Sequence, residues 1–267
     1  MTTNTISLTP RRERGWRMGL GNMLAKEIGS WLRTRRGWVQ CLIALLLLNG
    51  TMALNLRDNM SGTQNAILSF LVAAALCVPF AAVILAQDSI LGEKHSGTAA
   101  WVLSKPLCRP VYVLAKVFAH GLGLLVAWIV VPGTVAYLQL AKPLGGFLTP
   151  LRFAGVLGLD YLNLLFFLTL ALMLATLFNG RGPVLGISLV LAWSALPFVA
   201  GPIHQYAPWL YDILPWQLLI DFNFNQPLAA YLMNGQPLPT VVPIIATVLW
   251  CVLFVGVAIW RIGREEF

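Results

Sequence analysis

The sequence predicts an all-α, polytopic membrane protein, and three observations support this fold class. Of its 267 residues, 58% are hydrophobic and only 10% are charged, whereas a soluble domain carries roughly 25% charged residues to cover its surface. The apolar residues form long uncharged runs without the alternation of a membrane β-barrel. The basic residues lie almost entirely outside these runs. The composition therefore argues strongly against a water-soluble enzyme.

Six apolar runs are near the length that a helix needs to cross the hydrocarbon core, about 20 residues. They predict spans at residues 38–56, 66–86, 111–138, 159–178, 184–199 and 241–260. The fifth is the shortest. We expect a cytoplasmic segment at 1–36, a six-helix membrane domain at 37–260 and a cytoplasmic tail at 261–267.

The distribution of basic residues predicts the orientation. With a cytoplasmic N-terminus, 15 of the 18 Lys and Arg residues lie on the inner side, counting Lys116 at the start of the third span. Only Arg57, Lys142 and Arg152 lie outside. Positive residues are retained in the cytoplasm, so both termini are expected there, in the inner or plasma membrane. The net charge of +8 is then explained by topology and lipid headgroups, without a nucleic-acid partner.

Residues 20–33 precede the first span and predict an amphipathic helix. On a helical projection, Trp31 lies on the apolar face, and Lys26 and Arg33 lie on the opposite face. Glu27 is the exception, because it interrupts the apolar side. A helix of this kind is expected to lie in the membrane interface. The alternative is a solvated leader with some helical bias.

The loop at residues 87–109 predicts a short helix of its own. Thr98 can cap a helix over residues 99–103, and Pro106 ends it. Trp101 is then exposed at the tip of the loop, which is typical of a contact with a partner. The alternative is a plain connector whose Trp101 rests on headgroups.

The outer segment at 200–240 contains six prolines and several tryptophans and tyrosines. Aromatic residues with polar edges favour the membrane boundary. The segment is too apolar for water, yet it is broken by Pro215. We expect short helices that dip into the outer leaflet or cap the spans.

No motif for catalysis or metal binding is present. The sequence contains no GxxxxGK[ST] phosphate loop, no HExxH and no GxSxG, so it cannot bind ATP through a phosphate loop of its own. The three histidines lie in separate regions, and the four cysteines form no CxxC pair. We therefore predict no catalytic residue, no metal site and no bound cofactor.

Asp160 is the one acid within or beside a span. An ionisable group in hydrocarbon costs roughly 3 kcal/mol on insertion scales, so such groups tend to be functional. Asn163 follows three residues later and could share its face. These two are candidate intramembrane polar residues, although Asp160 could equally lie at the outer boundary of the fourth span.

Several short motifs resemble the ABC-2 type of ATP-binding cassette permease. The first inner loop carries Glu93-Lys94-His95-Ser96-Gly97-Thr98, then Leu103-Ser104-Lys105-Pro106, then Arg109 and Lys116. The start, with Lys26-Glu27 followed by Leu32-Arg33, and the basic-acidic ending at 261–267 are also similar to that family. His95 stands where a second acid is common.

The resemblance implies a permease subunit with six helices, paired with a second permease copy and with two copies of a separate cytoplasmic ATPase that holds ATP and Mg²⁺. It implies that the loop at 93–109 contains the coupling helix, and that the outer segment matches the re-entrant helices of the family. The candidate ATPase-contact residues are Glu93, Gly97, Thr98, Trp101, Leu103, Lys105 and Arg109.

The function expected from these observations is ATP-driven transport, with export favoured. Glu93, Lys105 and Arg109 would orient the loop by charge, while Trp101 and Leu103 would supply apolar contact. Membrane lipids are the remaining partner. The alternatives are a carrier or channel that works alone and a membrane scaffold or enzyme that transports nothing.

Overall fold

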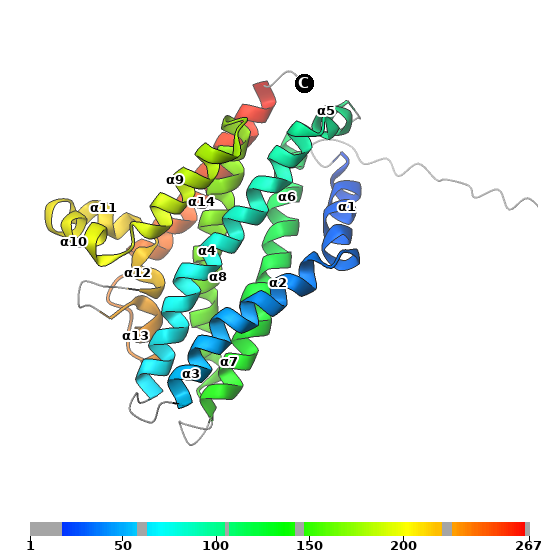
Figure 1. The fold of residues 1–267 in the computed structure, drawn as a ribbon. Helices are drawn as coiled ribbons and strands as arrows, with labels where there is room; N and C mark the ends of the chain where they lie inside the picture. Colours follow the sequence, from blue (N-terminus) through cyan, green and yellow to red (C-terminus); the bar gives the residue numbers. More distant parts are fainter. Residues whose placement is uncertain (1–17, 58–62, 105–106, 142–146, 221–225, 265–267) are drawn as a thin grey trace, which may run out of the picture.

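The computed structural model describes residues 18–57, 63–104, 107–141, 147–220 and 226–264, and it is all-helical over these ranges. Five helices are long and apolar enough to cross a membrane: Gly37–Arg57, Ala66–His95, Arg109–Ala141, Pro150–Leu177 and Val242–Arg264. Helices run side by side in a bundle (Figure 1). The predicted fold class is thus confirmed for the described residues.

The first and third spans each contain a π-helical turn. The first consists of α2 (Arg36–Ala44), η2 (Leu45–Asn49) and α3 (Gly50–Arg57). The third consists of α6 (Arg109–Leu124), η3 (Leu125–Val130) and α7 (Val131–Ala141). Pro132 follows η3, and the wider turn before it relieves the clash between a proline ring and the preceding carbonyls.

The fourth span, α8 (Pro150–Leu177), forms the centre of the bundle. It packs against α4 (Thr63–His95) and α14 (Val242–Arg264), and also against α6. Its apolar window is 67% buried, compared with 22% for the first and last spans. The outer spans therefore present apolar side chains to lipid or to another protein. Residues 150–158, which we placed before the span, are helical because a helix continues past the point where the uncharged run ends.

The fifth predicted span, at residues 184–199, is not one continuous helix. Helix α9 covers Arg181–Trp193, and its 13 residues extend about 20 Å, less than the hydrocarbon thickness of about 30 Å. Pro197 follows Leu196, whose extended backbone interrupts the helix. Six crossings therefore remain a prediction, with five long helices and one short apolar helix observed.

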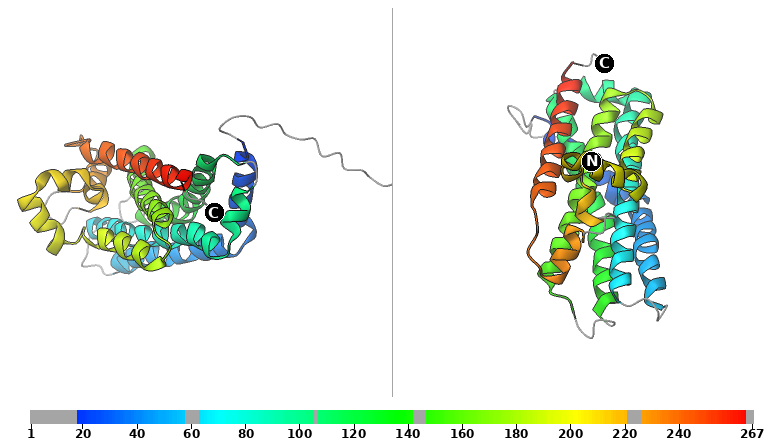
Figure 2. Two further views of the ribbon diagram at one scale, coloured as in Figure 1. Left: turned by 90° about the horizontal axis from the view of Figure 1, so that it is seen from above. Right: turned by 90° about the vertical axis from the view of Figure 1, so that its left-hand side faces the viewer.

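Outside residues 221–225, the segment between α9 and α14 contains four short helices: α10 (Pro197–Tyr206), α11 (Pro208–Ile213), α12 (Trp216–Leu219) and α13 (Leu228–Asn234). Helices α10 and α11 project sideways from the bundle (Figures 1 and 2). Short helices were expected here, and their place relative to the membrane remains a prediction.

Both described ends of the chain lie at one end of the bundle, which we call the charged end. It contains α1 (Leu20–Arg33), the last turns of α4 and α14, the helix α5 (Thr98–Leu103) and the start of α6 (Figure 1). Helix α1 has the bounds expected from the sequence, and α5 begins one residue earlier than expected, at Thr98, which we expected to cap it. The backbone N–H of Cys108 donates to the carbonyl of Met18, which ties the start of α1 to the start of α6.

Candidate functional site

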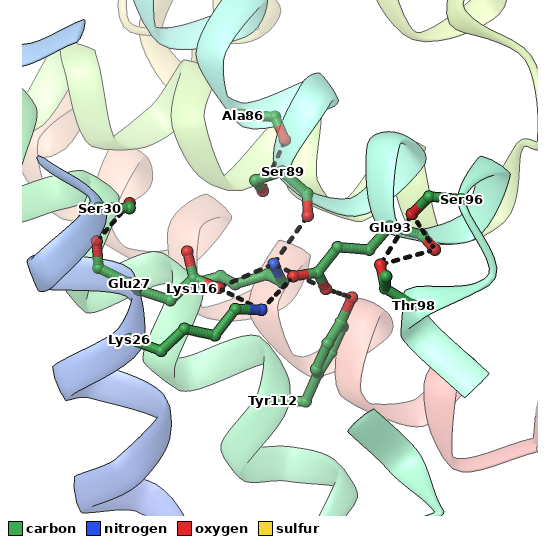
Figure 3. Close-up of polar contacts among 10 residues, drawn as sticks. All are labelled: Lys26, Glu27, Ser30, Ala86, Ser89, Glu93, Ser96, Thr98, Tyr112 and Lys116. Atoms are coloured by element: carbon green, nitrogen blue, oxygen red, sulfur yellow. Dashed lines mark hydrogen bonds and ion pairs between the residues drawn. The ribbon is translucent and has the colours of Figure 1, made fainter. Parts of the chain in front are cut away.

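A cluster of buried charges joins α1, α4 and α6 at the charged end (Figure 3). Its centre is Lys116 on α6, whose side chain is 1% exposed. The Nζ atom lies 3.2 Å from Oε1 of Glu27 and 3.1 Å from Oε2 of Glu93. It also donates a 2.7 Å hydrogen bond to the carbonyl of Ser89. A buried ammonium is tolerated only with such complete pairing.

Glu93, in the last turns of α4, is the second centre of this charge cluster. Its Oε1 accepts a 2.6 Å hydrogen bond from Nζ of Lys26, and its Oε2 accepts one of 2.6 Å from the hydroxyl of Tyr112. Lys26 lies on α1 and Tyr112 on α6. One carboxylate therefore holds three helices together.

Glu27 interrupts the apolar face of α1 because that face is buried against α6, where Lys116 supplies its partner. Met23 and Glu27 are the buried residues of the helix. The exception in the amphipathic pattern thus marks the side that packs on the bundle. Trp31 lies on the same side and makes an edge-to-face contact with His120, with 6.1 Å between ring centroids. Arg33 is exposed.

Lys26 is half-exposed, and two effects act on its pKa. Burial alone would lower the pKa of this ammonium, but the hydrogen bond and charge of Glu93, together with Glu27, raise it above its ordinary value. The side chain therefore remains charged at neutral pH.

Helix α5 follows the charge cluster directly. Gly97 takes a left-handed backbone conformation, with φ of 71°, which lets the chain turn from α4 into α5. The Thr98 hydroxyl lies 2.8 Å from that of Ser96 and 3.4 Å from the carbonyl of Glu93. Trp101 is 63% exposed. Leu103 is the last residue of α5, and Lys105 lies outside the described residues.

Arg109 begins α6 and contacts the other end of the described chain. Its Nη1 donates hydrogen bonds of 3.3 Å to the carbonyl of Ile262 and 2.5 Å to that of Gly263, in the last turn of α14. Carbonyls at a helix C-terminus have no partner within the helix, and a cation there is favourable. Arg109 therefore attaches the sixth predicted span to the third. It forms no hydrogen bond or ion pair with Glu93 here, so these two predicted contact residues lie in separate sets of interactions.

Asp160 and Asn163 lie on α8 and not in the charge cluster. They are 2% and 5% exposed, so Asp160 does not face solvent. Asp160 lies about 15 Å along the axis from the start of α8, at 1.5 Å per residue. Neither carboxylate oxygen has a hydrogen-bond partner among the residues that the structure describes.

Sequence reasoning missed two members of the cluster, Tyr112 and Ser89, and gave Lys116 no role beyond the motif. A signal for Lys116 was present, since it is the one Lys or Arg within residues 111–138. Together with the acid on the apolar face of residues 20–33, it could have predicted a buried pair. Tyr112 and the Ser89 carbonyl carried no such signal.

A bundle of long apolar helices with a cluster of paired charges at one end is typical of an integral membrane protein. Comparison with known proteins gives the family. The model of the ABC-2 family transporter proteins matches residues 22–267. The chain therefore belongs to the ABC-2 transporter family and is a membrane permease subunit of an ABC transporter.

Two known proteins are similar to this chain over different shares of its length. A probable ABC transporter permease protein NosY from Pseudomonas aeruginosa is 28% identical over 201 residues, which cover 70% of this chain and 72% of the relative. A probable ABC transporter permease protein NosY from Stutzerimonas stutzeri is 31% identical over 124 residues, 43% of each chain. The resemblance carried by residues 93–116 is thus confirmed at the level of the family.

Proposed function

We propose that this chain is the membrane subunit of an ATP-driven exporter and that a separate cytoplasmic ATPase drives it by contact with α5. The chain has no phosphate loop, so the partner would supply the site for ATP and Mg²⁺. In this proposal the chain has no catalytic residue of its own, and two ATPase copies serve two permease copies.

The observation that carries the proposal is the charge cluster beside α5. Glu93 lies four residues before Gly97 and contacts both α1, through Lys26, and α6, through Tyr112 and Lys116. A displacement of α5 would therefore move the end of α4 and, through one carboxylate, two further helices. Arg109 extends the same connection to α14.

Exposed apolar side chains support a pair of permeases. Trp38, Leu42 and Leu46 on the first span and Leu249 and Val252 on the last are each more than half exposed. Such surfaces require lipid or another subunit.

In the proposed mechanism, the ATPase pair closes on ATP and pushes α5 and α1 of each permease. The spans then tilt as rods, and a path opens between the two copies. The second copy is the same chain or a homologous permease.

The orientation follows from the charged end. In this proposal it faces the cytoplasm, with α1 in the interface of the inner or plasma membrane and both termini inside, as the basic residues favour. The helices α10 to α13 then cap the pathway on the outer side.

Purification in mild detergent with identification of co-purifying proteins tests the proposal. We expect a stoichiometric cytoplasmic ATPase, and we expect Trp101→Ala to weaken its association by about tenfold or more, because large exposed aromatics dominate interfaces. The matched control is Trp209→Ala on α11, which is 66% exposed and distant from α5 (Figure 1). It should leave the ATPase bound.

Three outcomes would contradict the proposal. Transport by the purified chain alone would favour a secondary carrier or channel. Absence of both transport and a nucleotide-binding partner would favour a scaffold. Equal effects of Trp101→Ala and Trp209→Ala would exclude α5 as the contact.

The direction of transport has its own test. An exporter should carry substrate into inverted vesicles when ATP is supplied on the outside.

A further inference from the structure

Two cavities of opposite character lie next to each other at the charged end, and Trp31 lines both. One, of about 280 Å³, lies between α1, α4 and α6 and is lined by charged groups. The other, of about 370 Å³, is an apolar groove between α1, α2 and the third span. A polar compartment beside an apolar one matches the two parts of an amphiphile.

The length of the spans places these cavities at the membrane surface. A hydrocarbon core of about 30 Å corresponds to about 20 helical residues. At the opposite end of the bundle, α3 and α7 end and α4 begins (Figure 1). Counted from there along the candidate spans, from Arg57, Ala66 and Ala141, 20 residues reach Trp38, Leu85 and Leu122. The headgroup layer adds about 5–7 Å, which corresponds to a further three to five residues.

The charged cavity lies at the depth of this headgroup layer. Ser89 and His120, which line it, are four and two residues beyond the hydrocarbon limit, and Lys116 is six residues, about 9 Å, beyond it, just past the headgroup layer. The apolar groove continues from Leu122 to Val126 and Val131, so it lies within the adjacent leaflet. From Lys116 to Val131 the helix extends about 22 Å at 1.5 Å per residue, the length of one lipid in its leaflet.

The charges of the first cavity restrict the kind of headgroup. It is lined by two ammonium groups, on Lys26 and Lys116, and by three carboxylates, on Glu27, Asp88 and Glu93. Asp88 also forms a 3.0 Å ion pair with Arg181, which leaves the cavity close to neutral. A headgroup with both charges can exchange contacts here, phosphate with Lys26 and ammonium with a carboxylate. A net negative headgroup would bring an uncompensated charge.

We infer that the two cavities form a binding site for a phospholipid with a zwitterionic, primary-amine headgroup, such as phosphatidylethanolamine. The headgroup occupies the charged cavity beside Lys26, and one acyl chain lies in the groove along Leu122 and Val126. The lipid stabilises the contact of α1 with the bundle. This site does not depend on the proposed ATPase coupling, since lipid binding is measured on the permease alone.

Native mass spectrometry of the full chain tests the inference. The detergent-purified protein is exchanged against equal amounts of phosphatidylethanolamine, phosphatidylcholine and phosphatidylglycerol. We expect phosphatidylethanolamine to be retained about tenfold better than either, a factor of the size that one charge-assisted contact contributes. Equal retention of the three lipids would overturn the inference, and preference for phosphatidylglycerol would replace it with a site for anionic lipid.

A matched pair of variants locates the site. Leu122→Trp places a bulky ring in the groove at a position that is 49% exposed, and Leu249→Trp makes the same change on α14 at a position that is 63% exposed. The first variant should reduce phosphatidylethanolamine retention about tenfold, and the second should not. Because both positions are exposed, both variants should fold, and thermal unfolding checks this. Retention unchanged in Leu122→Trp would contradict the assignment.

Discussion

Lys116 is a single residue on which the packing of three helices depends. Its replacement by Met leaves Glu27 buried without its closest partner, and breaking a buried pair typically costs about 3–5 kcal/mol. Lys26 still lies 3.6 Å from Glu27, so we expect a loss near the lower limit, about 3 kcal/mol of unfolding free energy. Titration with dodecyl sulfate in mixed micelles measures it.

Three further variants serve as controls for this prediction: Lys26→Met, Glu27→Met, and Glu27→Met combined with Lys116→Met. Lys26→Met removes a half-exposed partner and should cost less than about 1 kcal/mol. The double variant Glu27→Met with Lys116→Met should lose less than the sum of the single variants by about 1 kcal/mol or more, because the two groups interact directly. A Lys116→Met protein as stable as Lys26→Met would show that the buried ammonium contributes no more to stability than the half-exposed one.

At the scale of the element, α1 is held to α6 by close packing as well as by charge. A Cβ atom at Gly123 would overlap the indole ring of Trp31, so Gly123→Ala forces α1 away from α6. Overpacking of this kind costs about 1–3 kcal/mol. We expect faster hydrogen exchange throughout Leu20–Arg33, measured by mass spectrometry.

The control for this variant is Gly256→Ala on α14, where a Cβ atom meets nothing within 4 Å. Alanine is the better helix former by about 1 kcal/mol, so this variant should be as stable as the parent or more so. Unchanged exchange of α1 in Gly123→Ala would mean that Trp31 does not fix the helix in place.

The elements differ in how well the sequence predicted them. The bounds of α1, and those of α5 to within one residue, could be predicted because their causes are local: amphipathic spacing in one, and the signals of Thr98 and Pro106 in the other. The prediction of one continuous helix at 184–199 was wrong, because apolar composition does not show that Pro197 forces the residue before it out of the helical conformation. The start of α8 was missed because an uncharged window marks only the part of a helix inside the hydrocarbon core, and the helix itself begins before that part.

At the scale of the whole molecule, what remained unpredicted is the register between helices. Glu93 and Lys116 were both visible as motif residues, yet no spacing in the sequence indicates that Glu93 pairs with Lys26 and Tyr112 while Arg109 pairs with α14. Those partners lie 67 and 154 positions away in the chain. Only packing brings them together, so the composition of the cluster follows from tertiary structure and not from local pattern.

Both described ends of the chain and α5 lie at the charged end, whereas α8 begins at the opposite end (Figures 1 and 2). This arrangement makes a prediction about sidedness. On a background without its four native cysteines, Trp101→Cys and Leu151→Cys are each introduced at positions that are 63% and 82% exposed. We expect an impermeant maleimide to label Trp101→Cys only in inside-out vesicles and Leu151→Cys only in right-side-out vesicles, because positive residues are retained inside.

A third variant, Leu46→Cys, provides the control for sidedness, since that side chain is 73% exposed but lies near the centre of a membrane-spanning helix. Surrounded by lipid, it should resist the reagent from either side, because the hydrocarbon core holds no water to carry a polar maleimide or to ionise the thiol. If Trp101→Cys reacts from the external side, a cytoplasmic ATPase cannot reach α5. If Trp101→Cys and Leu151→Cys react from the same side, the third span, Arg109–Ala141, which separates them in the chain, does not cross the membrane as its length and hydropathy predict.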